Sequence, residues 1–464
     1  MANQSDNAMA LEQRSIDYIP ADERHGKPWH LFTLWFPSNL QINALVTGAL
    51  AVFFGLSLPW AIFSIIVGNL VGALFMAYHS VQGPRLGVPQ MIQSRAQFGF
   101  FGNILPVIIV VLMYLGFAVE GGVVVGAALA AWIHISRDLG IVIFNVILLL
   151  IALVGYNLIH AASRIISVIS AVAFVALFIQ LVTHLPANYK GTADTAGTVL
   201  LAISVFVSWQ VTWAPYVSDY SRYLPESTPA RTTFFYTYFG SVIGATVVMV
   251  IGAFAAVVNG AAVNANAIGF LGHRISGISA LMILALLIGL LPAGAEGPYG
   301  AFLTAWSAIS PNGRVDTSSV KVRALFVTVF TVIATVLAIL AGSHLLTTFE
   351  NITLFLLYLL VPWTAINLTD YYFVRRGNYD IGELFKVDGE YRRCNWGVLA
   401  IYVVSIGVEI PFVNSSIYVG PLVSHLGGAD IAWIVGIIVS SILYYAYARA
   451  THLTRAKTLI PLST

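Results

Sequence analysis

Long apolar segments alternate with short polar ones along nearly all of the 464 residues. A helix needs about 20 mostly apolar residues to cross the hydrocarbon core of a bilayer. On this criterion the pattern predicts an all-α integral membrane protein with about twelve spanning helices. We expect them near residues 30–56, 59–81, 103–134, 138–160, 163–185, 197–218, 232–258, 277–309, 323–343, 347–371, 397–414 and 430–450. The segments 103–134, 232–258 and 277–309 are long, which predicts tilt rather than extra spans.

Composition supports a membrane protein. The chain is 58% hydrophobic and 9% charged, whereas soluble domains carry about 25% charged residues. The net charge of +2 argues against a nucleic-acid partner. A single cysteine, Cys394, excludes an internal disulfide, and no His or Cys spacing is typical of a metal site. We therefore expect no metal or organic cofactor, and we infer no obligate protein partner.

The positions of the basic residues predict the orientation in the membrane. With the tail 1–29 in the cytoplasm, the outer loops hold only Arg137, Lys190 and Arg274 of the 22 Lys and Arg residues. Cytoplasmic loops of membrane proteins are enriched in Lys and Arg. The sequence thus predicts a multi-pass protein of the plasma (inner) membrane with both termini in the cytoplasm.

Three short motifs recur in the same order at an offset of five predicted helices. An odd offset means that the second copy crosses the membrane in the opposite direction, as in the inverted repeats of many secondary transporters. We expect a first repeat over 30–186, a second over 196–372, a cytoplasmic loop over 373–396, two peripheral helices over 397–452 and a tail over 453–464. The motif pairs are Trp35-Phe-Pro37 with Trp213-Ala-Pro215, Gly68-Asn-Leu-Val-Gly72 with Gly240-Ser-Val-Ile-Gly244, and Glu120-Gly-Gly122 with Glu296-Gly-Pro298.

Proline interrupts the first and the sixth predicted helix at corresponding positions. Pro37 is followed by Asn39 and Gln41, and Pro215 follows Thr212 and Trp213. Proline opens the helical hydrogen-bond ladder, and freed backbone groups are tolerated in the bilayer only where they line a cavity or face protein. Paired interruptions of this kind predict a substrate site at the membrane midplane. The alternative is that each proline only kinks its helix for packing.

Aromatic residues beside these interruptions favour a flat substrate. The indole of Trp213 offers a face on which a planar ring can stack. Phe117 shares one helix face with Tyr114 and Gly121 and is a candidate for the opposite wall. The alternative for these residues is ordinary core or interfacial packing.

Two acids, Glu120 and Glu296, lie near the middle of apolar helices, and no Lys or Arg lies within a spanning interior to pair with them. A lone carboxylate at this depth is costly to ionise and is a candidate functional group. Either acid is a candidate carrier of a coupling proton, and Glu296 is also a candidate acceptor for substrate N–H groups. The alternative is a protonated acid bonded to a neighbouring helix. Below the site, Asp219 and Arg222 can pair at i, i+3 as a structural or inner-gate element.

Several stretches resemble one transporter family. They are Val211–Pro225 in the sixth helix, Glu23–Trp29, Gln82–Gln90 with Ser94-Arg95, and Asp370–Gly377. On these residues the chain resembles the purine–cytosine permeases, the cytosine permease branch of the nucleobase–cation symporter-1 family. The resemblance covers the first ten helices and implies a leucine-transporter-like fold. That fold has two inverted five-helix repeats and two peripheral helices, and it works by alternating access.

The resemblance also implies roles for particular residues. It places the substrate ring between Phe117 and Trp213, with Thr212, Asn39, Gln41 and Glu296 as candidate polar contacts. Sodium-coupled members carry hydroxyl residues in the eighth helix, whereas this chain reads Pro292-Ala-Gly294 there. Proton coupling is therefore favoured over sodium coupling.

The sequence thus predicts a symporter, not an enzyme, that imports a nucleobase or a related planar heterocycle, such as cytosine, a purine, allantoin or a thiamine precursor. The alternatives are a sodium-coupled nucleobase symporter and an amino-acid or amine carrier on the same fold. A channel would not need paired broken helices. A membrane enzyme would show a nucleophile or metal motif, and none is recognisable in the sequence.

Overall fold

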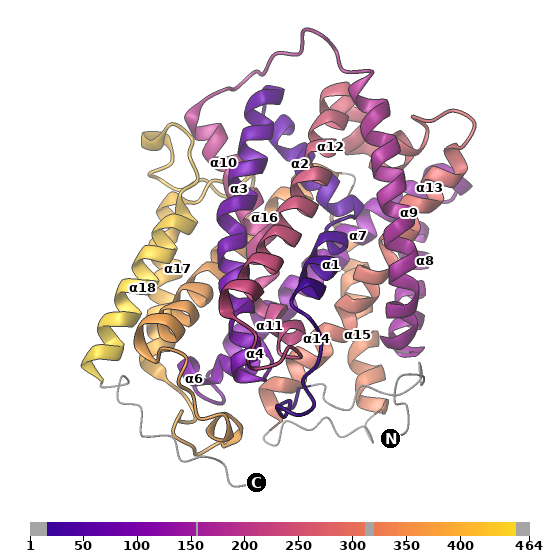
Figure 1. Cartoon of the computed structure of the whole chain (residues 1–464). Coiled ribbons are helices and arrows are strands. Elements are labelled where there is room, and N and C mark those ends of the chain that lie inside the picture. The colour runs from indigo at the N-terminus through magenta and orange to yellow at the C-terminus, as the bar shows by residue number, and fades with distance from the viewer. Residues whose placement is uncertain (1–15, 155, 311–319, 343, 452–464) are drawn as a thin grey trace.

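The computed structural model describes residues 16–154, 156–310, 320–342 and 344–451. Within these ranges the chain is helical, with one isolated β-bridge between Asn414 and Val419 (Figure 1). The predicted all-α class is confirmed. Most of both predicted cytoplasmic tails, residues 1–15 and 452–464, lies outside the described ranges.

Eight described helices are long and apolar enough to cross a membrane, and three shorter apolar helices accompany them. The larger helices are α1 (Trp29–Ser38), α2 (Ile42–Phe53), α3 (Leu58–Ser80), α7 (Ile104–Ile133), α8 (Arg137–Val154), α9 (Tyr156–Val182), α10 (Ala196–Val211), α12 (Ala230–Gly272), α13 (Ser279–Gly289), α14 (Leu291–Ile309), α15 (Val320–Leu340), α16 (Leu345–Thr369), α17 (Trp396–Glu409) and α18 (Ala432–Ala450).

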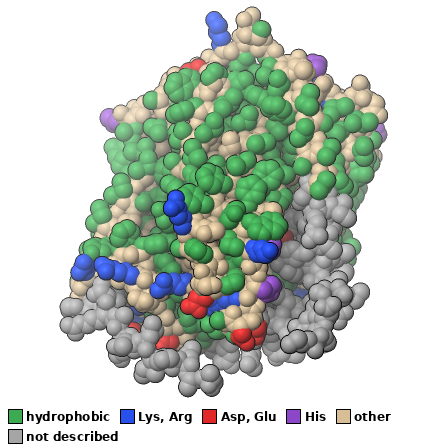
Figure 2. Space-filling view, in the orientation of Figure 1, with side chains coloured by type: hydrophobic (Ala, Val, Ile, Leu, Met, Phe, Trp, Pro, Cys, Tyr) green, Lys and Arg blue, Asp and Glu red, His purple; other side chains and the backbone are tan. Residues whose placement is uncertain are grey.

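Short helical turns connect these helices, mostly at the predicted cytoplasmic end. They are α4 (Gln82–Leu86), α5 (Gln90–Gln93), α6 (Arg95–Phe98), η1 (Ala214–Tyr216), α11 (Val217–Ser221), η3 (Asp370–Val374), η4 (Gly382–Phe385), η5 (Ile410–Phe412) and η6 (Ser424–Leu426). Hydrophobic side chains cover most of the surface in Figure 2, and most of the visible Lys and Arg side chains lie in its lower part.

Several predicted helix boundaries differ from the structure. The helix expected over 30–56 is two helices, α1 and α2, and the helix expected over 277–309 is divided at Leu290 into α13 and α14.

The seventh helix also continues beyond its predicted end, because asparagines restart it. Helix α12 runs on to Gly272 through non-helical backbone at Asn259 and Asn266. The Asn259 side chain accepts a hydrogen bond from the Ala262 amide at 3.0 Å, and Asn266 accepts one from the Gly269 amide at 2.8 Å. Each asparagine thus caps a new helical segment.

Glycines bring the central helices into backbone contact. A Cβ added at Gly68 or Gly72 of α3 would lie 2.5 Å and 2.7 Å from atoms of α10, and one added at Gly240 or Gly244 of α12 would lie 3.0 Å and 2.5 Å from atoms of α1. The two copies of the glycine motif therefore make equivalent contacts. In the first copy α3 packs on α10, and in the second copy α12 packs on α1. An inverted repeat requires this reciprocity. Helices α17 and α18 stand at one edge of this bundle (Figure 1).

Helices α2 and α12 approach most closely at Gly252. A Cβ there would lie 1.8 Å from the Leu45 carbonyl oxygen, which is backbone and cannot rotate away. We expect Gly252→Val to cost at least about 1–3 kcal/mol through overpacking and to lower the melting temperature of the purified protein in detergent. Gly260 of the same helix has nothing within 4 Å of its Cβ position, so Gly260→Val is the matched control. Equal melting temperatures for the two variants would contradict this packing.

Candidate substrate-binding site

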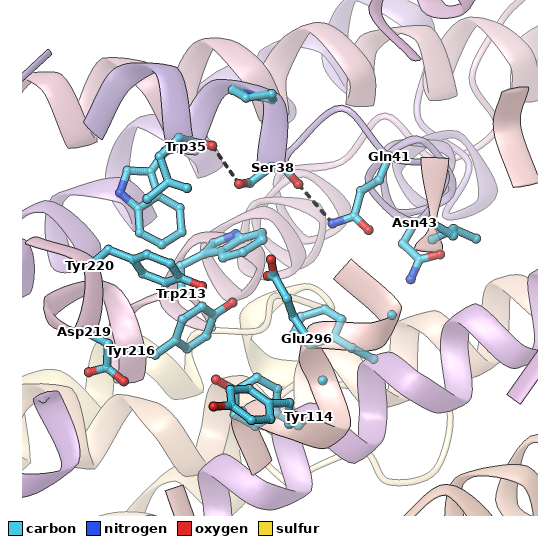
Figure 3. A pocket seen from close by; sticks show the side chains of 18 of the residues that line it. Trp35, Ser38, Gln41, Asn43, Tyr114, Trp213, Tyr216, Asp219, Tyr220 and Glu296 are labelled. Carbon is cyan, nitrogen blue, oxygen red and sulfur yellow. Dashed lines mark hydrogen bonds between the residues drawn. The ribbon is translucent and has the colours of Figure 1, made fainter. Parts of the chain in front are cut away.

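A cavity of about 720 Å³ lies where the interrupted helices meet (Figure 3). Its walls come from α1, α7, the segment from Trp213 to Tyr223, and α14. The lining residues include Trp35, Pro37, Ser38, Gln41, Asn43, Tyr114, Phe117, Gly121, Phe144, Leu148, Trp213, Tyr216, Asp219, Tyr220, Arg222, Glu296, Gly297, Gly300 and Thr304.

Both proline-containing interruptions are present in the structure. Helix α1 ends at Ser38, one residue after Pro37, and the extended backbone of Gln41 (φ −139°, ψ 156°) separates it from α2. Helix α10 ends at Val211, and Pro215 lies in the 3₁₀ turn η1. Pro37 and Gln41 line the cavity, so backbone freed at the first interruption faces it.

Trp213 is held in place by rings on three sides. Its indole meets Trp35 at 5.6 Å and 68°, Trp209 at 6.2 Å and 71°, and Tyr216 at 5.8 Å and 55°. Edge and tilted contacts of this kind are the favoured geometry between aromatic rings. Trp213 is 9% exposed and lines the cavity. A stacking surface fixed in this way loses little side-chain freedom when a flat molecule binds.

Phe117 and Gly121 lie on α7 and line the same cavity. The Phe117 ring meets Trp209 edge to face, at 5.9 Å and 83°. Trp209 therefore contacts both Phe117 and Trp213. The two rings predicted to enclose a substrate are walls of one space and share a neighbour that fixes their positions.

Glu296 and Gln41 supply polar groups to the cavity. Figure 3 shows the Glu296 carboxylate pointing into the space between Trp213 and Gln41. The Gln41 side-chain amide donates to the Ser38 carbonyl at 3.2 Å. Its own carbonyl oxygen can accept a hydrogen bond. Two kinds of acceptor beside a stacking surface are suited to a ring that carries N–H groups.

Asn39 and Thr212 lie outside the cavity lining, and their side chains are engaged elsewhere. The Asn39 amide oxygen accepts from the Trp209 indole N–H at 2.7 Å, and its NH₂ donates to the Trp35 carbonyl at 2.7 Å and the Ser241 hydroxyl at 3.3 Å. Thr212 donates to the Trp209 carbonyl at 2.7 Å. Asn39 thus connects the two interrupted helices with α12.

This connection continues into a chain of buried polar groups. Ser241 donates to the Gln210 amide oxygen at 2.6 Å, and Gln210 donates to the Asn69 oxygen at 2.7 Å. Side chains of α1, α10, α12 and α3 are joined in this way. Buried polar groups are costly unless paired, so the chain specifies one arrangement of the four helices.

Glu120 is buried and lies outside the cavity lining. Neither carboxylate oxygen has a hydrogen-bond partner among the described residues. One turn earlier on α7, the Cβ position of Gly116 lies against Ile352 and Leu356 of α16. The acid therefore lies close to an apolar helix contact, and the structure separates it from Glu296, which faces the cavity.

Asp219 and Arg222 line the cavity just beyond the second interruption, in and directly after α11. Asp219 accepts from the Gln90 amide at 2.9 Å. Arg222 donates to the Asp219 carbonyl at 3.2 Å and to the Asp17 carbonyl at 2.7 Å. These contacts join α11 to α5 and to the segment before α1.

Sequence reasoning missed three aromatic residues of the cavity lining, Trp35, Tyr216 and Tyr220. Tyr216 and Tyr220 follow the predicted Trp213 at spacings of three and four residues, which is typical of a single helical face. That spacing was the available signal. Trp35 is 1% exposed and meets Tyr220 at 5.4 Å and 84°, a contact across two helices that no local pattern shows.

Comparison with known proteins identifies the class. The profile of the family described as "Permease for cytosine/purines, uracil, thiamine, allantoin" matches residues 18–436. The chain belongs to this family, and it is a membrane transporter rather than an enzyme. It is 41% identical over 440 residues to the Putative purine-cytosine permease YxlA of Bacillus subtilis, covering 94% of this chain and 96% of that one. It is 24% identical to the purine-cytosine permease fcyB of Emericella nidulans, covering 94% and 87%.

Solved structures show the same fold. The nucleobase-cation-symport-1 transporter Mhp1 matches in its inward-facing conformation with a TM-score of 0.74, at 19% identity, over 97% of this chain and 96% of Mhp1. Mhp1 closed around bromovinylhydantoin matches with a TM-score of 0.72, over 98% and 97%. The predicted leucine-transporter-like fold is thereby confirmed.

The placement of Asn39 generates a test. We expect Asn39→Ala to leave the buried Trp209 N–H unpaired, at a cost of about 1–3 kcal/mol, and to lower the melting temperature of the substrate-free protein. Thr212→Val, which leaves that N–H paired, is the control. If Asn39→Ala changes substrate affinity but not the melting temperature of the free protein, Asn39 is a substrate ligand and not part of the network.

Proposed function

We propose that this protein is a symporter that imports a nucleobase or a related planar heterocycle by alternating access. The main support is a single cavity beside the two interrupted helices. Trp213 and Phe117 line this cavity, and the Glu296 carboxylate points into it. The family profile and the purine-cytosine permease relatives support this substrate class. We place the protein in the plasma membrane with both termini in the cytoplasm.

The chemistry of the cavity favours a flat ring with neighbouring N–H groups. Stacking on Trp213 is tolerant of ring type because any base has a π face. Specificity then comes from the ring edge, where a carboxylate accepts well from N–H donors, as Glu and Asp do from cytosine. In this proposal Glu296 receives the substrate N–H groups, and Gln41 accepts a further one.

The side of the membrane from which a substrate can reach the cavity is inferred from the end of the cavity that loop residues line. The cavity extends from Gln41 to Asp219, Arg222 and Tyr223 at the end of α11, and Ile16 before α1 also lines it. In the proposed orientation this end faces the cytoplasm.

We propose the proton as the coupling ion, with Glu120 and Glu296 as candidate carriers. Glu120 has no hydrogen-bond partner among the described residues, and Glu296 faces a cavity in whose described lining Arg222 is the only Lys or Arg. The sequence Pro292-Ala-Gly294 offers no hydroxyl for sodium, although the side chains of residues 292 and 293 lie outside the described ones.

The primary experiment is uptake of labelled cytosine, adenine, guanine, hypoxanthine and allantoin by cells that express the protein and otherwise lack nucleobase uptake. We expect saturable uptake of at least one heterocycle. Amino acids and amines serve as competitors, because the Glu296 carboxylate can also neutralise an ammonium group. Competition by amines, with no heterocycle taken up, would contradict the proposal.

The stacking role of Trp213 is tested by Trp213→Ala. Loss of the indole face removes about 1–3 kcal/mol, which is roughly 5- to 150-fold in affinity. The measurement is equilibrium binding of the labelled heterocycle to purified protein. Trp396→Ala is the control, since this tryptophan is 75% exposed at the start of α17 and lies outside the cavity lining. Equal affinities for the two variants would remove Trp213 from the site.

The coupling role of Glu296 is tested by Glu296→Gln. We expect wild-type uptake to rise as the external pH falls and to be independent of sodium. Gln keeps the shape of Glu but cannot exchange a proton, so the variant should lose the pH dependence. Retained pH dependence with altered selectivity would mean that Glu296 is only a substrate ligand. Glu120→Gln, measured alongside, shows whether the other acid carries the proton.

A further inference from the structure

Helix α14 presents glycines to the cavity in place of side chains. Gly294, Gly297 and Gly300 all line it and are spaced by three residues, so they lie on one face of the helix. Glu296 projects into the cavity from the same turn. What fills the space beside each glycine therefore decides the shape of the cavity next to the carboxylate.

Two of these glycines are covered by neighbouring helices. A Cβ at Gly294 would lie 3.0 Å from Leu148 of α8, and one at Gly300 would lie 2.8 Å from the ring and hydroxyl of Tyr114 on α7. At Gly297 no described atom lies within 4 Å of the Cβ position. The cavity wall therefore has a recess at Gly297, between Leu148 on one side and Tyr114 on the other.

The other glycines of the lining leave no such space. A Cβ at Gly121 would lie 3.6 Å from Phe144, in ordinary contact, and one at Gly289 would lie 2.8 Å from the Ser170 hydroxyl. Among the described cavity-lining glycines, Gly297 alone borders open space. The recess is thus a local feature of one residue and not a general looseness of the cavity.

We infer that Gly297 determines substrate size: the recess at Gly297 admits the second ring of a fused bicyclic heterocycle of the purine type. The inference rests on the proposed function, since it requires a ring bound at Glu296. A ring whose N–H edge meets that carboxylate has its neighbouring edge beside Gly297. Leu148 and the Tyr114 ring lie against the glycines three residues before and after Gly297, so the recess suits an aromatic extension better than a charged one.

Gly297 also precedes Pro298 inside a helix. A side chain before proline disfavours the helical conformation, because the proline ring crowds the preceding Cβ. This backbone effect would impair transport of every substrate to the same degree. A filled recess would impair bicyclic substrates selectively. The two causes are therefore separable by comparing ring sizes.

The experiment compares inhibition of labelled-substrate uptake by hypoxanthine and adenine, which are bicyclic, and by cytosine and uracil, which are monocyclic. Wild-type protein should be inhibited by the bicyclic compounds at least as well as by the monocyclic ones. In the Gly297→Ala and Gly297→Val variants, inhibition by the bicyclic compounds should become about tenfold or more weaker relative to inhibition by the monocyclic ones. Gly407→Val is the control, because Gly407 on α17 also has nothing within 4 Å and lies outside the cavity lining.

A second pair of variants removes the proline effect. Pro298→Ala alone should keep wild-type selectivity, and Gly297→Ala combined with Pro298→Ala should still discriminate against bicyclic compounds. The inference is overturned if the Gly297 variants weaken both ring classes equally, if the double variant regains wild-type selectivity, or if the wild type takes only monocyclic substrates. Absence of any heterocycle uptake by the wild type would instead overturn the proposed function.

Discussion

Two helices stop inside the membrane, and the polar groups freed there must find partners within the protein. In the hydrocarbon core each unsatisfied backbone group costs several kcal/mol. At the first interruption the Gln41 side chain donates to the Ser38 carbonyl, and the Asn39 side chain donates to the Trp35 carbonyl. Asn39 also begins a side-chain network through Trp209, Ser241, Gln210 and Asn69 that connects four helices. The same constraint leaves the backbone near Gln41 facing a cavity, where a substrate can complete its hydrogen bonding.

Close helix packing gives this network its geometry. Glycines at Gly68 and Gly72, and at Gly240 and Gly244, let the two repeats make the same contact in opposite directions. Side chains at these positions would push the helices apart and lengthen hydrogen bonds between helices, such as those from Ser241 to Gln210 at 2.6 Å and from Trp209 to Asn39 at 2.7 Å. Trp213 depends on the same packing, since the rings around it come from both interrupted helices.

Local chemistry in the sequence predicted the interruptions at Pro37 and Pro215, the aromatic residue beside one of them and the intramembrane acids. It did not predict features that depend on partners far away in the chain. The bond between Asn39 and Trp209 spans 170 positions, so Asn39 was expected to contact substrate, whereas it lies outside the cavity lining. The extension of α12 depends on asparagine caps within an apolar run, which hydropathy alone cannot separate from a loop.

We propose that a planar heterocycle lies between Trp213 and Phe117 with its N–H edge at Glu296. An electron cryo-microscopy structure of the purified protein with saturating hypoxanthine would show this directly. We expect flat density stacked on the Trp213 indole, with one edge within hydrogen-bond distance of the Glu296 carboxylate. Density at another place in the cavity, such as beside Tyr220 and Asp219, with the space between Trp213 and Phe117 empty, would contradict it.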